Sequence, residues 1–306
     1  MEKMISAIPN FCEGRNTAVI DEVTAALRRV DHLFVLDVSA DRLRNRTVFS
    51  LIGPQRAILE AGRLLYGLAR EKIDMRKHRG DYPRLGALDV FPIVPVQEST
   101  IQEAAKLAEE LGRLVAKEFD VPVYLFGEAA RSPLRREVDA IREGEYEGLA
   151  RKLLDPQNKP DYGPDTFDPT FGATIIGARF PLITFMAFFD TKDEEAVAAI
   201  AKSVAYAHGG LSQVRTYYGM VPERGEAQVT VKIANYTATP HYRVVELMKV
   251  EARRFGVRLK GVDLIGLTPQ SVLVEAAQYY LSLRDFTPDK LLETSLKKHL
   301  PKERNL

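Results

Sequence analysis

HLFVLDVSADRLRNRTVFSLIGP, residues 32–54, decides the fold of the first half of the chain. Residues 32–38 and 46–53 are rich in Val, Leu, Ile and Phe, and the polar residues between them indicate a turn. Pro54 is suited to open a helix because its fixed backbone angle matches a first helical turn. Behind it, one apolar stripe consists of Ala57, Ile58, Ala61, Leu64, Leu65 and Leu68. The stretch therefore predicts strand, strand and helix in succession.

The flanking segments complete a longer order of elements. Residues 4–11 predict a strand, and Asn16 or Thr17 is suited to cap the helix that follows it. Residues 89–96 predict the strand after the second helix. A further helix and strand extend this half, over residues 100–119 and 121–126. The first six elements run β-α-β-β-α-β, which is the order of a ferredoxin-like sandwich.

The second half repeats this order. Its strands are predicted at residues 180–189, 214–221, 227–236 and 257–266, and its helices at residues 193–207 and from Thr239-Pro240 to about residue 255. The sequence therefore predicts an α+β protein of two ferredoxin-like (β-α-β-β-α-β) sandwich subdomains. We place the first at residues 1–178 and the second at residues 179–306.

The charge balance argues against some classes of partner. The 306 residues include 43 basic and 42 acidic side chains, a formal net charge of +1. Such a balance disfavours a protein that grips nucleic acid or a membrane through bulk charge, but it allows a small basic pocket. No glycine-rich nucleotide motif occurs. The composition therefore predicts neither a nucleic-acid nor a membrane partner, and it allows a small acidic ligand.

Cysteine and histidine usage predicts no metal centre. Cys12 is the one cysteine, so neither an intramolecular disulfide nor a cysteine metal site is expected, and the scattered histidines have no metal spacing. Without a paired histidine, Cys12 is expected to be a bystander thiol. The N-terminus lacks a signal peptide, and the longest apolar stretches fall short of the roughly 18 residues that a membrane span needs. A cytoplasmic location is expected.

Two loops are unusual in composition. MRKHRGDYPRLGALDV, residues 75–90, gathers four basic side chains with His78 and Tyr82, and its first part has no hydrophobic period. DPQNKPDYGPDTFDPTFGA, residues 155–173, has four prolines and two glycines, as a linker would, but also three aromatic residues. A loop of that length is either disordered or functional, and its aromatic content favours a function.

With these loops in view, six segments carry a resemblance to a known family. They are PNFCEGRN (9–16), NRTVFSLIGP (45–54), GALDVFPIVPV (86–96), DVPVYLFGEAAR (120–131), IREGEYEGL (141–149) and DYGPDTFDPTFGAT (161–174). Together they resemble the formiminotransferase domain of glutamate formiminotransferases, and the similarity covers nearly the whole chain.

The resemblance implies a dimer of two-lobed subunits that holds a folate between the lobes. Members move a formimino or formyl group between N5 of tetrahydrofolate and glutamate. Tetrahydrofolate, or its 5-formyl or 5-formimino form, is therefore the expected substrate, and glutamate the expected acceptor. Stacking on aromatic rings and close backbone approach at glycine suit a flat pterin. The folate-contacting segment of the family falls on Gly163, Pro164, Asp165, Thr166, Phe167, Asp168, Pro169, Thr170, Phe171 and Gly172.

Two positions depart from the family pattern. The catalytic histidine of the family falls at Tyr82, and the carboxylate thought to assist it falls at Ser39. An ordinary tyrosine has a pKa of about 10 and a histidine one of about 6.5, so an unperturbed Tyr82 is a poor base at neutral pH. His78 keeps its family position as a candidate surrogate base, and Arg84 is a candidate carboxylate ligand. For both residues, holding the loop in place is the alternative role.

Neighbouring charges are expected to affect this loop. Crowding by Arg76, Lys77, Arg79 and Arg84 would lower the pKa of Tyr82. A solvated basic edge is the alternative for the first three, and steering of a polyglutamyl folate is a further role for them. Asp37 and Arg46 lie where two predicted strands face each other, which suggests a buried structural pair.

Three functions remain open at the level of the sequence. The first is a folate-dependent one-carbon transferase with altered proton-transfer groups. The second is a non-catalytic folate-binding carrier or regulator, which the loss of both family residues favours. The third is a pocket reassigned to an unrelated acidic ligand.

Overall fold

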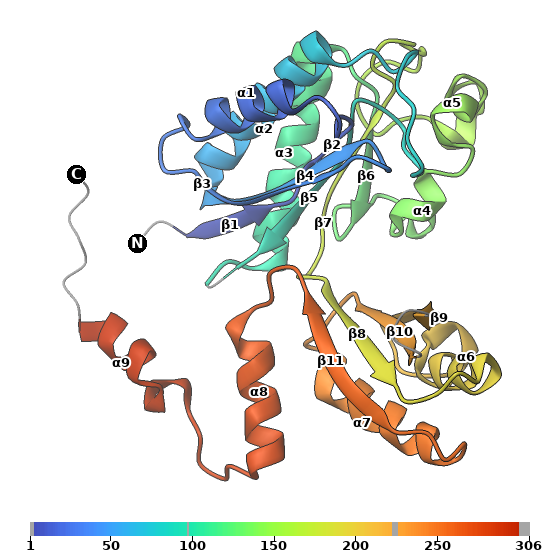
Figure 1. Cartoon of the computed structure of the whole chain (residues 1–306). Coiled ribbons are helices and arrows are strands. Elements are labelled where there is room, and N and C mark those ends of the chain that lie inside the picture. The colour runs from blue at the N-terminus through green and yellow to red at the C-terminus, as the bar shows by residue number, and fades with distance from the viewer. Residues whose placement is uncertain (1–2, 97, 222–225, 300–306) are drawn as a thin grey trace. The chain divides into compact units, whose positions relative to one another are not determined.

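The computed structural model describes residues 3–96, 98–221 and 226–299, and the chain divides into two compact units, Met1–Phe180 and Pro181–Leu306 (Figure 1). Each unit is a mixed α+β sandwich, as the sequence predicts. The two units are called unit 1 and unit 2 below, and each is described by itself.

Unit 1 is built on a seven-stranded sheet. Its strands are β1 (Met4–Ala7), β2 (Asn10–Phe11), β3 (Phe34–Asp41), β4 (Arg46–Pro54), β5 (Leu88–Pro95), β6 (Val123–Gly127) and β7 (Thr174–Ala178). The helices are α1 (Thr17–Leu27), α2 (Gln55–Lys72), α3 (Ile101–Phe119), α4 (Val138–Ile141) and α5 (Glu145–Leu153).

The sheet contains the ferredoxin-like order that the sequence predicts. β1 and β2 are two halves of one interrupted strand, because both pair antiparallel with β4 on one side and β5 on the other. β3 pairs with the free edge of β4, which completes the antiparallel set of four strands. β7 and β6 then extend the sheet as parallel strands beyond β5. β7 was not predicted, because its five residues are all buried and show no alternation.

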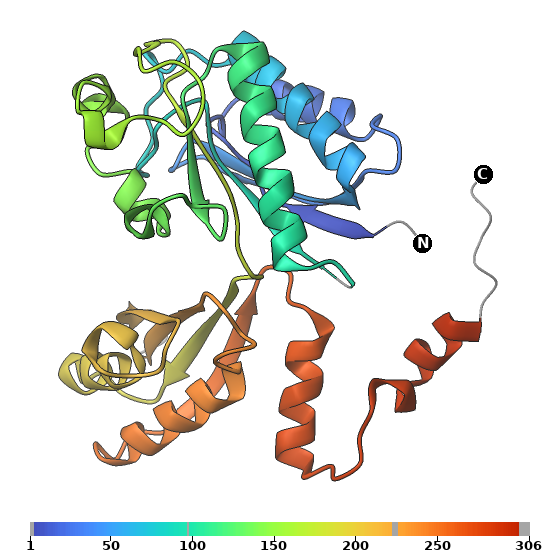
Figure 2. The same cartoon turned by 180° about the vertical axis from the view of Figure 1, so that it is seen from behind.

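Three helices cover one face of this sheet, where the main core lies (Figure 2). α1 begins where Asn16 accepts a hydrogen bond from the Val19 amide. α3 begins with a capping box in which Thr100 and Glu103 satisfy each other's backbone amides. The predicted stripe of α2 is buried at Ala57, Ile58, Ala61 and Leu65. These helices fix the strands whose ends and opposite face carry the polar residues described below.

The other face of the sheet is covered by helices near β6 but is more exposed near β3. α4 and α5 lie beside β6 (Figure 1) and enclose a second apolar cluster that includes Tyr124, Phe126 and Leu149. Toward β3 this face exposes apolar side chains, and Phe34 is 57 % exposed. The half of this face that carries β3 and β4 is therefore more accessible to solvent.

Unit 2 repeats the four-stranded topology and adds two helices after it. Its elements are β8 (Ile183–Phe189), α6 (Glu194–Val204), β9 (Val214–Val221), β10 (Glu226–Ile233), α7 (His241–Arg253), β11 (Leu259–Ile265), α8 (Gln270–Leu281) and α9 (Leu292–His299). The antiparallel order β11-β8-β10-β9 is ferredoxin-like, so this prediction is confirmed. α6 and α7 pack over a core of aliphatic and phenylalanine side chains.

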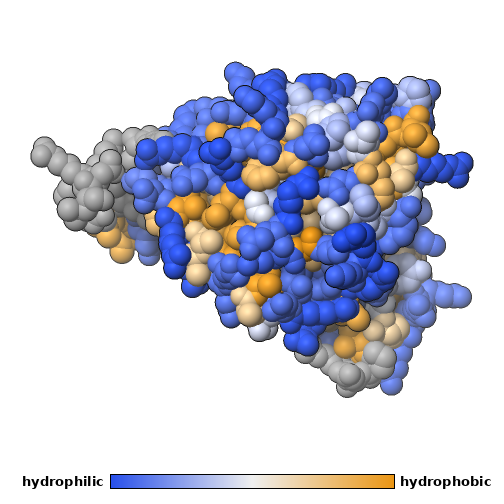
Figure 3. Space-filling view, turned by 90° about the horizontal axis from the view of Figure 1, so that it is seen from above, coloured by the Kyte–Doolittle hydropathy of each residue, from blue (hydrophilic) through white to orange (hydrophobic). Residues whose placement is uncertain are grey.

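The surface agrees with the balanced composition. The face drawn in Figure 3 is mainly hydrophilic and is interrupted by small apolar patches. Among the described residues, no helix combines the length and the apolar character needed to cross a membrane.

Candidate functional site

Two loops that are far apart in sequence lie side by side in unit 1. The segment after α2, residues 74–87, carries Tyr82, and the segment before β7, residues 168–173, ends the predicted folate loop. Three backbone hydrogen bonds join them, from Met75 N to Thr170 O (2.9 Å), from Ala87 N to Phe171 O (2.8 Å) and from Ala173 N to Leu85 O (3.1 Å). The residue positions expected for proton transfer and for folate contact therefore belong to one connected structure.

Glycine allows this close approach. Gly86 and Gly172 form a β-bridge, and Gly172 has a φ of +81°, a backbone angle that residues other than glycine rarely adopt. A Cβ atom added to Gly86 would lie 2.3 Å from the Ala173 carbonyl oxygen. A larger residue at either glycine would therefore push the two loops apart.

Tyr82 lies against two guanidinium groups. The Cζ atom of Arg46 is 3.9 Å from the centroid of the Tyr82 ring, and that of Arg142 is 5.2 Å away. Burial alone would raise the pKa of this half-buried phenol. The positive charges of Arg142 and Arg46 outweigh burial and hold the Tyr82 pKa below its ordinary value. Tyr82 is therefore more acidic than a free tyrosine.

Arg142 is held in place by a buried carboxylate. Asp89 has no exposed surface, and its Oδ2 accepts a hydrogen bond from Arg142 Nη2 in an ion pair. Its Oδ1 accepts another from the Leu85 amide at 2.9 Å. Asp89 lies at a β-bulge, because Asn10 pairs with Val90 while the next residue of β2 pairs with Leu88. Bulges of this kind redirect a side chain and recur beside active sites.

The Tyr82 pKa is lowered, as predicted, but the largest charge effects on it do not come from the basic residues of its own loop. Arg76 pairs with Asp74 at 2.8 Å, and Lys77 lies 3.8 Å from the same carboxylate. Arg79 donates to backbone carbonyl oxygens within the loop. The charges that act on Tyr82 come instead from β4 and from the residue after α4.

Arg84 is engaged through its two Nη groups, whereas its buried Nε has no hydrogen-bond partner among the described residues. Its guanidinium group binds both carboxylate oxygens of Glu147, at 3.0 and 2.7 Å, and approaches Glu145 at 3.4 Å. Burial would raise the pKa of Glu147, but the hydrogen bonds and charge of Arg84 hold it below its usual range. Arg84 therefore fastens α5 to the Tyr82 loop, which corresponds to the loop-holding alternative.

His78 is a buried imidazole with one free nitrogen. Its Nε2 lies 2.9 Å from the Asn45 carbonyl oxygen, which can only accept, so Nε2 carries a proton. Its Nδ1 is buried and has no hydrogen-bond partner in the part of the chain that the structure describes. Burial lowers the pKa of His78, so the neutral imidazole is favoured and Nδ1 presents a lone pair.

The β3–β4 register places Ser39 on the face that carries Arg46. Ser39 lies opposite Val48 and Asp41 lies opposite Arg46, so side chains two residues apart share one face. Ser39 is exposed there. The expected buried pair of Asp37 with Arg46 is wrong, because Asp37 is exposed and Arg46 lies over the Tyr82 ring.

The predicted folate loop contains both core and accessible residues. Phe171 is 1 % exposed and packs on Tyr66 with 6.2 Å between ring centroids, so it belongs to the core and not to a stacking surface. Phe167 is half-buried and lies 5.6 Å from the Tyr146 ring. A cavity of about 360 Å³ is lined by Arg70, Glu118, Phe119, Asp120, Pro164, Thr166, Phe167 and Asp168.

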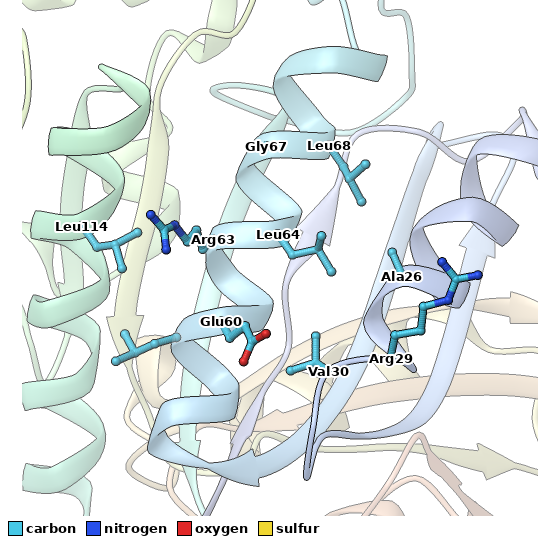
Figure 4. Close-up of a pocket in the computed structure, with 10 residues that line it drawn as sticks. Ala26, Arg29, Val30, Glu60, Arg63, Leu64, Gly67, Leu68 and Leu114 are labelled. Carbon is cyan, nitrogen blue, oxygen red and sulfur yellow. The ribbon is translucent and has the colours of Figure 1, made fainter.

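Two further features lie outside this chemistry. Cys12 is buried, donates to the Gly86 carbonyl oxygen and has a pKa raised mainly by burial, so its thiol stays protonated and unreactive. A groove of about 910 Å³ runs between α1, α2 and α3 (Figure 4), where Leu64 and Leu68 face it from α2. None of the predicted site residues lines this groove.

Sequence reasoning missed Asp89 and Arg142 as site residues. Arg142 lies 60 positions after Tyr82 in the chain, within a segment that was noted only for its resemblance to a family. Its proximity to Asp89, and the bulge that aims Asp89, depend on tertiary structure and leave no periodic signal.

Comparison with known proteins identifies the family of the chain. Residues 4–179 match the family described as "Formiminotransferase domain, N-terminal subdomain", and residues 191–293 match "Formiminotransferase domain". A glutamate formimidoyltransferase of Streptococcus pyogenes serotype M1 is 38% identical over 97% of this chain and 99% of its own length. One from Thermoplasma acidophilum is 35% identical over 96% and 98%. The chain also matches 53% of the formimidoyltransferase-cyclodeaminase of Rattus norvegicus at 36% identity over 92% of its own length.

Proposed function

Because the chain belongs to the formiminotransferase family and is therefore a transferase, we propose that it moves a formimino or formyl group between N5 of tetrahydrofolate and glutamate or a related acceptor. The observation that carries the proposal is the set of backbone hydrogen bonds that joins the Tyr82 loop to residues 168–173. A folate held by the second segment would bring its reacting nitrogen close to the first.

The properties of the loop support a folate ligand. Its cavity of about 360 Å³ lies within the usual range for small-molecule pockets. Phe167 offers a half-buried aromatic ring, and Arg70 and Asp168 add polar groups, although these two pair with each other at 3.0 Å. We propose that Phe167, in place of Phe171, is the ring that a pterin contacts.

The reaction defines what the other residues must do. When the one-carbon unit passes between two nitrogens, the attacking nitrogen loses a proton and the leaving nitrogen gains one. A group that accepts and returns this proton accelerates the step. Tyr82 occupies the family position for this group. Ser39 lies on the same sheet face as Arg46, the arginine next to Tyr82. The Nδ1 atom of His78 has no hydrogen-bond partner among the described residues. We propose Tyr82 as the proton-transfer residue and the other two as residues that shape its surroundings.

Arg84 has a positioning role in this proposal. Its guanidinium group is already engaged by Glu147, so a substrate carboxylate would have to displace an ion pair. Through α5 it also supports Tyr146, whose hydroxyl donates to the Pro169 carbonyl oxygen at 2.6 Å. Arg84 thus connects the Tyr82 loop to the proposed folate segment.

A transfer assay tests the proposal directly. Tetrahydrofolate with formiminoglutamate, and 5-formyltetrahydrofolate with glutamate, are the two reactions to follow. We expect turnover in one of them, and calorimetry should detect micromolar or tighter binding of the folate. Binding without turnover would identify a folate carrier or regulator instead. No binding of either folate would leave the pocket for an unrelated acid.

Three further properties are proposed: a homodimer from the family, and a cytoplasmic location and independence of metal from the sequence. We expect the chain to act as a homodimer in the cytoplasm and to require no metal. Sedimentation velocity would show a dimer at micromolar concentration if the first expectation holds, and a monomer would overturn it. Turnover that survives extensive treatment with a chelator would support the last expectation.

A further inference from the structure

Among the residues that the structure describes around the Tyr82 ring, no carboxylate forms an ion pair with Arg46, so one positive charge is unbalanced. Arg46 and Arg142 contribute two positive charges, and Asp89 contributes one negative charge. Asp41 faces Arg46 across the β3–β4 ladder, but its carboxylate is held by Arg44 at 2.8 Å. Arg84 is paired with Glu147, and Cys12 and His78 are neutral. Placing an unbalanced charge in a partly buried site is costly. A negative oxygen at Tyr82 would restore the balance.

The positions of these groups are built into the fold. Asp89 is fully buried at a bulge and uses one oxygen for the Leu85 amide, which leaves the other for Arg142. The Nε atom of Arg142 is buried and has no hydrogen-bond partner among the described residues. Arg46 reaches the same ring from β4, at the last pair of the β3–β4 ladder. Two separate strands and the end of α4 therefore converge on one phenol.

We propose that Arg46 and Arg142, the latter oriented by Asp89, stabilise the phenolate of Tyr82 and so make Tyr82 the proton acceptor of the site. The proposal rests on the proposed function and adds two positioning residues to it. The Tyr82 oxygen takes a proton from the attacking nitrogen as the new N–C bond forms. It returns that proton to the leaving nitrogen as the old C–N bond breaks, so no net proton is consumed.

The direction of the Tyr82 pKa supports this role, since the arginine charges outweigh burial. His78 does not supply the missing charge, because an imidazole is neutral or positive. In this account the family histidine was replaced by a tyrosine whose acidity is raised by arginines. Tyr82 and the two arginines beside it therefore act together in proton transfer.

Labelling the full chain with tyrosine carrying ¹³C at Cζ tests the ionisation without any substrate. The Tyr82 signal is assigned by its loss in Tyr82→Phe. We expect it to titrate at lower pH than the exposed tyrosines, and Arg46→Met should raise its midpoint by about 1 pH unit or more. Arg131→Met is a matched control, because Arg131 lies 4.4 Å from the ring of Tyr162. A Tyr82 signal that titrates with the exposed tyrosines would overturn the inference.

A second variant guards against loss of folding. Arg142→Met alone would leave the buried Asp89 carboxylate without its cationic partner, so it is combined with Asp89→Asn. The double variant should also raise the Tyr82 midpoint, whereas Arg142→Lys should keep it close to that of the wild type. An unchanged midpoint in the double variant would contradict the role of Arg142.

The pH profile of kcat/KM tests whether the ionisation is used. The acid limb should follow the Tyr82 midpoint and move to higher pH in Arg46→Met. An acid limb that stays in place while the midpoint moves would overturn the proton-transfer role. If the proposed function is wrong but the ionisation is real, the Tyr82 signal will titrate at low pH while the transfer assay detects no turnover.

Discussion

Units 1 and 2 share one topology but differ in what they bury. In unit 2, the described residues form an aliphatic and aromatic core in which Thr239 is the one buried polar side chain. Unit 1 buries Asp89, His78, Arg84 and Arg142 as well. His78, Arg84 and Arg142 come from a loop and from the residue after the short helix α4, whereas Asp89 lies at the bulge in β5. The comparison indicates that the frame supplies rigidity and the additions supply chemistry.

Among substitutions that distinguish unit 1 from unit 2, the largest expected effect is on catalysis. Tyr82→Phe removes the phenol oxygen and leaves the ring between the arginines, so kcat should fall by about 10² to 10⁴. Stability should change little, because the ring still fills its place. Steady-state kinetics measures the first effect and denaturant unfolding the second. Tyr206→Phe, at a tyrosine 67 % exposed in unit 2, is the matched control and should leave kcat unchanged. A loss below threefold in Tyr82→Phe would remove Tyr82 from the reaction.

Removal of a buried cation should affect unit 1 strongly. Arg142→Met leaves Asp89 fully buried without its partner, which typically costs about 3–5 kcal/mol of unfolding free energy. Combining it with Asp89→Asn should recover much of that loss, because no uncompensated charge remains. Urea unfolding of both variants gives the comparison. Equal stability of the single and double variants would mean that Asp89 is not ionised in the folded protein.

Truncating a core phenylalanine should destabilise either unit to a similar extent but should affect folate binding only in unit 1. Phe171→Ala in unit 1 and Phe185→Ala in unit 2 each empty a fully packed site and should cost about 3–5 kcal/mol. Only Phe171→Ala should also weaken folate binding, because the Phe171 side chain packs on Tyr66 and so holds in place the backbone that joins the two loops. Calorimetry at a temperature where both variants are folded measures this. Equal folate affinity in both variants would separate residues 168–173 from the site.

The half-buried aromatic ring of the loop should have a direct effect on the ligand. Phe167→Ala is expected to weaken folate binding by about 1–3 kcal/mol, the scale found for loss of a stacking aromatic side chain from a nucleic-acid site. Its stability cost should be smaller than that of Phe171→Ala, because Phe167 is only half-buried. Unchanged folate affinity would show that the pterin does not contact this ring.

The smallest expected effect is on the pH dependence of stability. Burial lowers the pKa of His78 in unit 1 and of His241 in unit 2, so the unfolded chain binds more protons than the folded one below about pH 6.5. The unfolding free energy should therefore decrease as pH falls below that value, by at most about 1.4 kcal/mol per pH unit for each histidine. His78→Gln and His241→Gln should each reduce this slope, and the exposed His208→Gln should not. An unchanged slope in all three would assign the acid sensitivity to carboxylates.

Much of the fold could be predicted because hydrophobic periodicity and caps are local. The stripe of α2, the Asn16 cap and the strands of unit 2 all lie where the sequence indicates. β7 escaped prediction because a short, fully buried parallel strand has no alternation. The α4–α5 segment likewise lacks a long amphipathic period, since its helices have four and nine residues.

The site was predicted less completely, for reasons of tertiary structure. Tyr82 and the loop at residues 163–172 were identified from family resemblance, and their joining through Gly86 and Gly172 depends on long-range pairing. Arg142 lies near Tyr82 while paired with Asp89, which is itself at a bulge, and neither feature leaves a local pattern in the sequence. The burial of Phe171 also depends on packing against Tyr66, which no local pattern reveals.

Titration of the ¹³Cζ-tyrosine-labelled chain with 5-formyltetrahydrofolate tests the central claim, that unit 1 holds a folate beside Tyr82. The account predicts a saturable shift of the Tyr82 signal, while the signal of the exposed Tyr217 in unit 2 stays constant. A Tyr82 signal that does not move at concentrations where calorimetry shows the folate bound would contradict it.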